Sequence, residues 1–470
     1  METHYLHPAG ELATTAETFR LSTVDHVVTQ HYSIWAIFFK LADENTESIT
    51  QGFREALEMT LGQCRHFVGR IEVNEFGDFS IVKKPSSTVR FDVRWLDKPG
   101  DTYPSFSELE NAGFISQVLG DPALITIAGM TMASERHPRT CPDVCAFQLT
   151  FVRGGCILAV HRHHLVCDVA GLTSFVRQIA GNCRAVFAGA ELPDWDETWM
   201  DRSRFITPPV PLADQVQPPD APKRHPGWLP CSWLLFHIDQ AKVAELKKLA
   251  TPDDGTWIST YDAIVAFLWR IITKNRAAIY EPDLSGPAVF LVSVNMRQRL
   301  NPPIHERYQG NLVCGGLSFR QENPPSLADV ISQVPLSRLA AFIRKVTQSV
   351  TSQTMDEMLK TAAPIQDKST LHVRLDSVPP MSLAATDWRK VLICDEDFGI
   401  GQPAAARFIA DTVFENMVTL YPTRPSHGSS GSSSGVDVVI PFETHAIGQL
   451  IGDTDMIEFF EFRGVEVKGS

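Results

Sequence analysis

Apolar residues recur with two different periods along the chain, and the period predicts where helices and strands form. Residues 56–71 (ALEMTLGQCRHFVGRI) have helical spacing, and after Gly69 the pattern changes to the alternation of a strand. Residues 146–160 (AFQLTFVRGGCILAV) are two apolar runs joined by Gly154 and Gly155, a dipeptide that favours a tight turn between antiparallel strands. The first part of the chain therefore combines helices with an antiparallel hairpin.

The hairpin leads directly into the sequence HHLVCDVAG, residues 163–171. Beyond it, apolar residues recur from Leu172 to Cys183 with the spacing of an amphipathic helix of about three to four turns. HHLVCDVAG is therefore predicted to form the turn between a strand and a helix.

A proline-rich stretch without periodicity, residues 192–230, is predicted to link two domains that comprise residues 1–191 and 231–470. The second domain restarts with a predicted strand at 232–238 and continues with a helical stretch at 240–250. A longer helix is predicted at 260–276, with an acidic residue in its first turn and Arg276 in its last, as the helix dipole prefers.

Composition and charge narrow the class of protein. The 470 residues are 44% hydrophobic and 21% charged, as in a globular protein of two domains. A net charge of -13 argues against nucleic-acid binding, which needs a basic surface. No stretch approaches the roughly 20 apolar residues that span a bilayer, and the N-terminal residues do not resemble a signal peptide. With nine scattered cysteines, we expect a cytoplasmic monomer with free thiols that binds neither nucleic acid nor membrane.

The histidines of HHLVCDVAG suggest chemistry as well as structure. A histidine held at a strand end has a pKa near 6.5 and is suited to remove a proton from an alcohol or amine that attacks a carbonyl. Asp168, four residues after His164, is equally suited to cap the following helix. A metal site is the third reading, but strand alternation points His161 and His163 to one face and His164 to the other, so no metal is predicted.

Two further stretches bear on this choice. In DEDFGIGQP, residues 395–403, two glycines around one aliphatic residue suggest a backbone that turns or approaches another segment closely. In SVNMRQRL, residues 293–300, a short strand ends near Arg297 and Arg299. These arginines are expected to form bidentate pairs with aspartates such as Asp168 or Asp397.

Taken in order, these stretches resemble the BAHD acyltransferases, within the coenzyme A-dependent superfamily that includes chloramphenicol acetyltransferase and peptide-synthetase condensation domains. His164 and Asp168 match the family's H-x-x-x-D motif, and residues 397–401 (DFGIG) match its D-F-G-W-G motif. LSTVDH near the start, FVGRI and YQGN agree as well. Val169 replaces the usual glycine and Ile400 the usual tryptophan, as in the fungal branch typified by trichothecene 3-O-acetyltransferases, which modify hydroxyls of terpenoid-type secondary metabolites.

The resemblance implies an α/β, two-domain chloramphenicol acetyltransferase-like fold, with mixed sheets flanked by helices and a channel between the domains. His164 would lie midway along the channel, remove the acceptor's proton in a ternary complex with acyl-CoA, most simply acetyl-CoA, and then protonate the CoA thiolate. Of the other two residues of the predicted catalytic set, Asp168 would hold the turn by pairing with Arg297, and Asp397 would organise the domain junction from a remote position.

The resemblance also implies that acyl-CoA is a cosubstrate rather than a permanently bound cofactor, contacted near Ser259 and Thr260 at the start of the 260–276 helix. The aromatic residues Trp35, Phe38 and Phe39 would line the acceptor pocket or, more commonly for such residues, pack in the core. One alternative is a condensation-type enzyme that forms amides from a carrier-bound acyl donor, since such domains also carry paired histidines. Another is a catalytically silent scaffold, which the intact His164 argues against.

Overall fold

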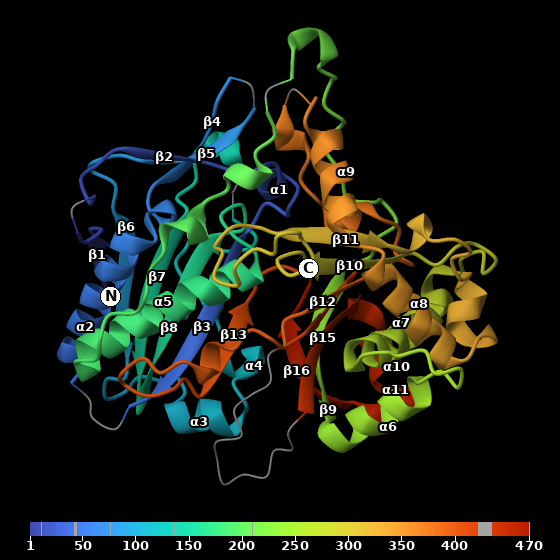
Figure 1. Ribbon diagram of the computed structural model, residues 1–470. Helices are drawn as coiled ribbons and strands as arrows, with labels where there is room; N and C mark the ends of the chain where they lie inside the picture. Colours follow the sequence, from blue (N-terminus) through green and yellow to red (C-terminus); the bar gives the residue numbers. More distant parts are fainter. Residues whose placement is uncertain are drawn as a thin grey trace.

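The computed structural model describes residues 1–10, 12–41, 45–75, 77–134, 137–208, 210–365, 367–421 and 435–469. Two large sheets form the centres of two halves that lie side by side (Figure 1). Both sheets are mixed, because each contains parallel as well as antiparallel pairs. The mixed α/β architecture agrees with the prediction.

The first half is built on a six-stranded sheet of order β1-β6-β7-β8-β3-β13. Its strands are β1 (Glu2–Leu6), β3 (Tyr32–Lys40), β6 (Val89–Leu96), β7 (Cys145–Val152), β8 (Gly155–His163) and β13 (Ala405–Ile409). The predicted hairpin is confirmed, since β7 and β8 pair antiparallel across Gly154. A small sheet beside it contains β2 (Glu17–Arg20), β4 (Arg70–Val73) and β5 (Phe79–Lys83).

Helices cover one face of this sheet. α2 and α5 run across it and pack against each other (Figure 1). The helices of the first half are α1 (Thr23–His26), α2 (Thr46–Gln63), α3 (Phe106–Asn111), α4 (Ser116–Leu119) and α5 (Val169–Ala188). The helix predicted after HHLVCDVAG is therefore α5, and its apolar face is buried against the sheet.

The second half is built on a seven-stranded sheet of order β11-β10-β12-β14-β15-β9-β16. Its strands are β9 (Cys231–Asp239), β10 (Phe290–Asn295), β11 (Val313–Leu317), β12 (Leu383–Asp387), β14 (Met417–Leu420), β15 (Gly435–Glu443) and β16 (Glu461–Val467). Its helices are α6 (Gln240–Ala250), α7 (Thr260–Tyr280), α8 (Leu336–Gln348), α9 (Ser352–Ala362), α10 (Ile447–Ile451) and α11 (Thr454–Phe459).

The longer helix of the second half differs from its prediction at one end. α7 begins at Thr260, as expected, but continues past Arg276 to Tyr280. Arg276 is therefore not a basic residue of the last turn that faces solvent. It is buried and forms an ion pair with Glu443 at 3.0 Å, so tertiary pairing rather than the helix dipole accounts for its position.

One strand of the first sheet comes from the second half of the sequence. β13 comes from the predicted second domain, yet it pairs antiparallel with β3 in the first sheet, with Arg407 opposite Ala36. In Figure 1 this orange-red strand lies beside the blue strand β3. The boundary at 192–230 stays a prediction, and the residues after it contribute a strand to the sheet of the first half as well as forming the second sheet.

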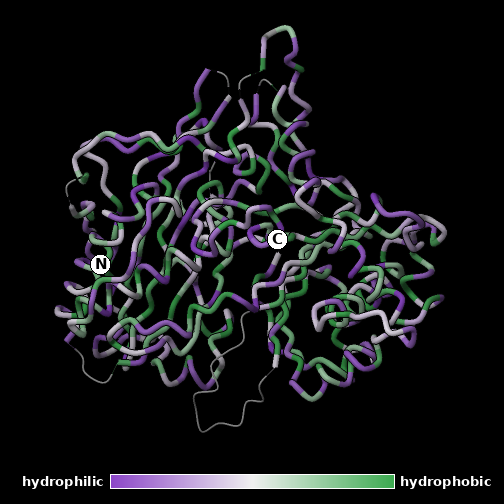
Figure 2. Tube along the Cα trace, in the orientation of Figure 1, coloured by the Kyte–Doolittle hydropathy of each residue, from purple (hydrophilic) through white to green (hydrophobic). Residues whose placement is uncertain are grey.

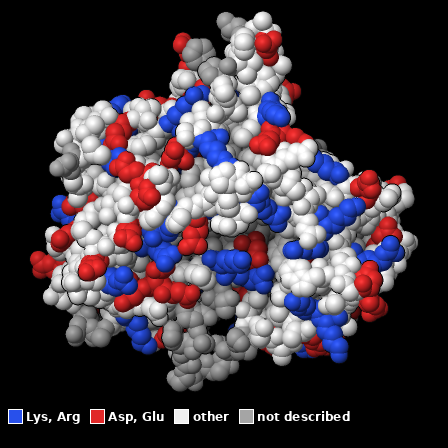
Figure 3. Space-filling view, in the orientation of Figure 1, with Lys and Arg blue, Asp and Glu red and all other residues white. Residues whose placement is uncertain are grey.

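Hydrophobic residues are concentrated along many of the strands (Figure 2). Every residue of β7 and β8 is buried, which fits a sheet covered on both faces. At the surface, acidic and basic side chains are interspersed over the face shown in Figure 3. Among the described residues, no helix combines the length and apolar character that crossing a bilayer requires.

Candidate active site

His164 and Asp168 occupy the tight turn between β8 and α5, as predicted. The backbone N–H of His164 donates to the His31 carbonyl at 2.9 Å, which holds the turn on β3. Asp168 is the N-cap of α5, and its Oδ1 accepts a hydrogen bond from the Gly171 N–H at 2.8 Å. Asp168 therefore has the capping role that the sequence allowed.

His164 faces a cavity of about 770 Å³ that is lined from both halves of the molecule. His31, Ser33 and Trp35 of the first half line it together with Ser293 and Trp388 of the second. Trp35, Phe38 and Phe39 are all buried in the core, and Trp35 also lines the cavity. A cavity of this size with largely apolar walls and a few polar groups is typical of a small-molecule site.

The environment of His164 favours its neutral form. Burial, followed by the positive charge of Arg162, lowers its pKa to about 3, and interactions with its own backbone carbonyl and with Asp168 oppose this only in part. Its Nδ1 is enclosed and has no hydrogen-bond partner within the described ranges. A neutral imidazole at the cavity wall is able to accept a proton from a bound hydroxyl near pH 7.

The second histidine of the pair lies on the other side of the strand. His163 is buried, its ring packs edge-on against Tyr32 with centroids 5.2 Å apart, and its Nδ1 accepts a hydrogen bond from the Leu165 N–H. His161, on the same face as His163, accepts a hydrogen bond from the Ile127 N–H. Strand alternation therefore separates His164 from its neighbours. In the part of the chain that the structure describes, no group of His, Cys, Asp or Glu side chains is arranged to hold a metal ion.

Asp168 is held by the arginine that the sequence pointed to. Arg297 donates to its two oxygens at 2.9 and 3.0 Å, and the Leu312 N–H donates to Oδ2 at 2.8 Å. Burial acts to raise the pKa of Asp168, but the Arg297 charge and these hydrogen bonds outweigh it, so the pKa lies below its usual value. The Asp168–Arg297 pair thus joins the turn of the first half to the end of β10 in the second.

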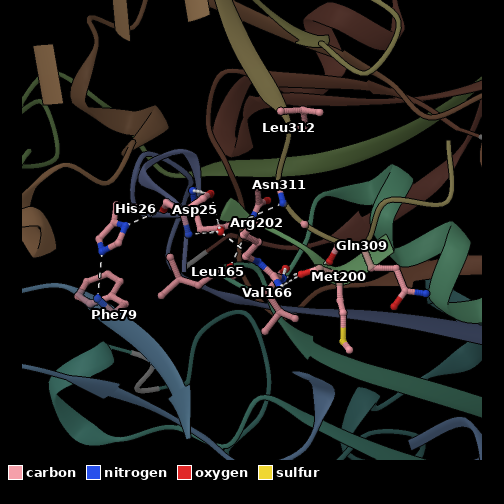
Figure 4. Close-up of polar contacts among 12 residues, drawn as sticks. Asp25, His26, Phe79, Leu165, Val166, Met200, Arg202, Gln309, Asn311 and Leu312 are labelled. Carbon is pink, nitrogen blue, oxygen red and sulfur yellow. Dashed lines mark hydrogen bonds and ion pairs between the residues drawn. The ribbon is translucent and has the colours of Figure 1, made fainter. Parts of the chain in front are cut away.

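A second network, which the sequence did not suggest, holds the backbone of the same turn (Figure 4). Asn311 donates through Nδ2 to the His164 carbonyl at 2.9 Å and to Asp25 Oδ1 at 2.8 Å. Arg202 lies 3.2 Å from Asp25 Oδ2 and donates to the Val166 carbonyl at 2.6 Å. The LSTVDH and YQGN stretches contain two of these residues, whereas Arg202 lies in the proline-rich stretch, where no local pattern marks it.

The comparisons with known proteins agree with this geometry. Residues 119–450 match the model described as Transferase family, and residues 31–183 match the trichothecene 3-O-acetyltransferase-like N-terminal domain. The chain belongs to this family of BAHD-type acyltransferases. It is 39% identical to the acetyltransferase FGR3 of Gibberella zeae, over 98% of this chain and 94% of that protein.

More distant relatives of the acyltransferase agree on the fold. The trichothecene 3-O-acetyltransferase of Fusarium sporotrichioides is 25% identical over 70% of this chain and 72% of that protein. A crystal structure of that organism's enzyme, complexed with coenzyme A and T-2, superimposes with a TM-score of 0.76 at 20% identity, over 95% of this chain and all of that one. The predicted acyltransferase fold, with mixed sheets flanked by helices, is confirmed.

The DFGIG loop of the acyltransferase lies apart from the cavity lining. Asp397 is exposed and accepts a hydrogen bond from the Gly399 N–H at 2.9 Å, and no arginine pairs with it within the described residues. The expectation of an arginine partner for Asp397 is therefore wrong, because its carboxylate faces solvent and closes its own turn. The loop is anchored instead by Phe398, which is fully buried and packs edge-on against Phe39 at 4.8 Å.

Position 399 of the loop requires a glycine, because of both its backbone conformation and its close contact with α5. Its φ is +77°, and an added Cβ would lie 2.9 Å from the Arg184 Cα of α5. The backbone therefore turns and approaches α5 closely, as the sequence predicted. The loop docks the chain between β12 and β13 onto α5, the helix that Asp168 caps.

Ser259 and Thr260, the predicted CoA contacts, lie at the start of α7 and outside the cavity lining. Ser259 is the N-cap: its Oγ accepts a hydrogen bond from the Asp262 N–H at 3.2 Å, and its own N–H donates to Asp262 Oδ2 at 2.7 Å. These bonds form a capping box. Capping accounts for the serine and the aspartate, and the contact with CoA stays a prediction.

Proposed function

We propose that this acyltransferase transfers an acetyl group from acetyl-CoA to a hydroxyl of a small-molecule acceptor, with His164 as general base. The neutral imidazole of His164, at the wall of a cavity shared by both halves, carries the proposal. The relatives named as acetyltransferases and the neighbour solved with coenzyme A and T-2 support the donor and the kind of acceptor. A hydroxylated terpenoid-type secondary metabolite is the proposed acceptor class.

The reaction proceeds in one ternary complex. His164 takes the proton of the acceptor hydroxyl as its oxygen attacks the thioester carbonyl. The tetrahedral intermediate then expels the CoA thiolate, and the imidazolium of His164 returns the proton to the sulfur. No acyl-enzyme forms, and the histidine ends neutral for the next turnover.

Two contacts hold the turn that carries His164 in position. Asn311 holds the His164 carbonyl, and Arg297 holds Asp168 at the other end of the turn. A base that is already in place requires no reorganisation in the transition state. We assign Asp168 and Asn311 as positioning residues, because neither is available to exchange a proton with substrate.

The amide-forming alternative rested on paired histidines. In this structure His163 packs against Tyr32 on the face of β8 opposite His164, so the pair does not act together at the cavity. Nothing else in the site favours a carrier-bound acyl donor over CoA.

Thiol release tests the proposal. Purified protein is incubated with acetyl-CoA and a panel of terpenoid and polyketide alcohols, and free CoA is followed with a chromogenic thiol reagent. We expect acceptor-dependent release that falls by about 10²-fold or more in His164→Ala. His7→Ala, at an exposed histidine, is the control and should match the wild type. Full activity in His164→Ala would show that the base is another group.

A further inference from the structure

A buried arginine to which the described residues supply no partner lies next to the proposed base. Arg162 precedes His164 by two residues, so both side chains leave the same face of the chain and line the cavity. Arg162 is only 2% exposed. Its neighbours across the sheet are Ser33 on β3 and Cys145 on β7.

No hydrogen bond or ion pair of the Arg162 side chain is found among the described residues, and its Nε and Nη1 are enclosed without a partner. Other buried arginines of this chain differ. Arg276, 1% exposed, pairs with Glu443 and donates to backbone carbonyls, and Arg297 pairs with Asp168. The fold therefore supplies a counter-charge where an arginine is structural, and supplies none to Arg162.

No described residue pairs with Arg162 as a counter-ion. Glu357 also lines the cavity, but it is exposed and forms no ion pair with Arg162. The nearby carboxylate of Asp168 is already neutralised by Arg297. Burial raises the pKa of Cys167 to about 11 and that of Cys145 well above its usual value, so both thiols stay protonated near pH 7. An arginine does not lose its own proton in a protein. The cavity therefore contains an uncompensated positive charge beside His164, which is costly unless an anion joins it.

A neutral hydroxyl accompanies this charge. Ser33 lines the same cavity, and its Oγ lies 3.0 Å from His31 Nε2, which fixes its orientation. A guanidinium and a neighbouring hydroxyl are suited to a planar monoanion with two acceptor oxygens. A single arginine matches the single charge of a carboxylate, and the largely apolar walls suit the organic group that carries it.

We propose that Arg162 and Ser33 form a carboxylate-binding subsite in the cavity, beside His164. The carboxylate belongs to the substrate, either to an acidic acceptor or to a dicarboxylic acyl group on CoA. The part of the subsite in catalysis rests on the proposed acyl transfer, whereas the binding of a carboxylate does not. The subsite would orient the acceptor hydroxyl or the thioester toward His164.

Ligand binding without turnover tests the subsite. Benzoate is titrated into the protein by calorimetry, with benzyl alcohol and benzamide as neutral analogues of similar shape. We expect saturable binding of benzoate alone, weakened at least tenfold in Arg162→Met and partly retained in Arg162→Lys. Equal binding of benzoate by the wild type and both variants, or no binding by the wild type, would overturn the proposal.

Thermal unfolding gives an independent test. Because Arg162 has no partner in the described part of the chain, Arg162→Met should unfold at the wild-type temperature or above it. Arg162→Gln repeats the measurement with a polar side chain. The matched control, Arg276→Met, should unfold well below the wild type or fail to accumulate, since it leaves Glu443 buried and unpaired. Destabilisation of both Arg162 variants to the same extent as Arg276→Met would show that Arg162 is structural.

Two binding arms identify which substrate carries the carboxylate. In one, malonyl-CoA is compared with acetyl-CoA, and in the other 4-hydroxybenzoate is compared with its methyl ester on CoA-saturated protein. Loss of affinity in Arg162→Met for malonyl-CoA alone assigns the acyl group, and loss for 4-hydroxybenzoate alone assigns the acceptor. If neither arm depends on Arg162, the subsite is wrong. Carboxylate binding without thiol release from any CoA thioester would instead contradict the proposed acyl transfer and leave the subsite intact.

Discussion

Asp168 and Asp397 belong to two motifs of the same family, yet their side chains have opposite environments in the structure. Asp168 is buried, and its oxygens accept hydrogen bonds from Arg297, the Gly171 N–H and the Leu312 N–H. Asp397 is exposed and closes its own turn through the Gly399 N–H. In the DFGIG loop, Phe398 and Gly399 make the long-range contacts instead. A motif aspartate is thus not by itself a sign of a buried ionic brace.

Removal of Asp168 should have the largest effect on folding. Asp168→Ala leaves Arg297 buried without its carboxylate and removes the cap of α5, so we expect a loss of about 3–5 kcal/mol in the free energy of unfolding. Denaturant titration of the purified variant measures it. Arg297→Met in combination with Asp168→Ala should recover part of the loss, and an unchanged midpoint in the single variant would contradict the brace.

Asn311→Ala sharpens the comparison at the turn itself. It removes the hydrogen bond to the His164 carbonyl and leaves Asp25 with one partner fewer, at an expected cost of about 1–3 kcal/mol in stability. Because the base would also be less well placed, kcat should fall more than KM changes. A variant that loses stability but keeps the wild-type kcat would show that Asn311 supports the fold and not the base.

Gly399→Ala addresses the DFGIG loop. Alanine at a φ of +77° and 2.9 Å from the Arg184 Cα is strained, and we expect a loss of about 1–3 kcal/mol in the free energy of unfolding. Gly401→Ala is the matched control, because its φ is also positive but an added Cβ meets nothing within 4 Å. If the two variants lose equal stability, backbone conformation rather than contact with α5 explains the effect.

Asp397→Ala should have a much smaller effect than Asp168→Ala. It removes one exposed hydrogen bond within the loop, and we expect a loss of no more than about 1 kcal/mol. Thermal unfolding and thiol release, measured side by side for the two alanine variants, give the comparison directly. A loss as large as that of Asp168→Ala would mean that Asp397 has a partner in a state of the enzyme that this structure does not represent.

The smallest expected effect is that of pH on the base. The pKa of His164 is lowered to about 3, so the neutral form persists as the pH falls and kcat/KM should show no loss near the ordinary histidine pKa of about 6.5. Removing the Arg162 charge should raise the pKa of His164 and move any acid limb upward. A steep loss of kcat/KM near pH 6.5 in the wild type would show that His164 is more solvated than its burial implies.

The pKa of Asp168 is also lowered. Its contribution to stability is therefore present above the pKa that Asp168 has in the unfolded chain, and is lost only as the pH falls through its lower pKa in the folded protein.

Local patterns determined much of this protein. The hairpin, α5, β9 and the start of α7 follow from apolar periodicity and capping residues that lie within a few positions of one another. The placement of His164 and His163 on opposite faces follows from strand alternation. These features depend on interactions between near neighbours, so the sequence was sufficient to predict them.

Only the tertiary structure decided which distant residues meet. β13 pairs with β3, Arg202 contacts Asp25 and Arg276 pairs with Glu443, all across long separations in the chain. Arg162, by contrast, finds no partner among the residues that the structure describes. No local period encodes such contacts, because they depend on how two sheets and their helices pack. An arginine therefore looks the same in the sequence whether folding gives it a carboxylate or leaves it facing a cavity, and that difference decides whether it braces the fold or is available to a ligand.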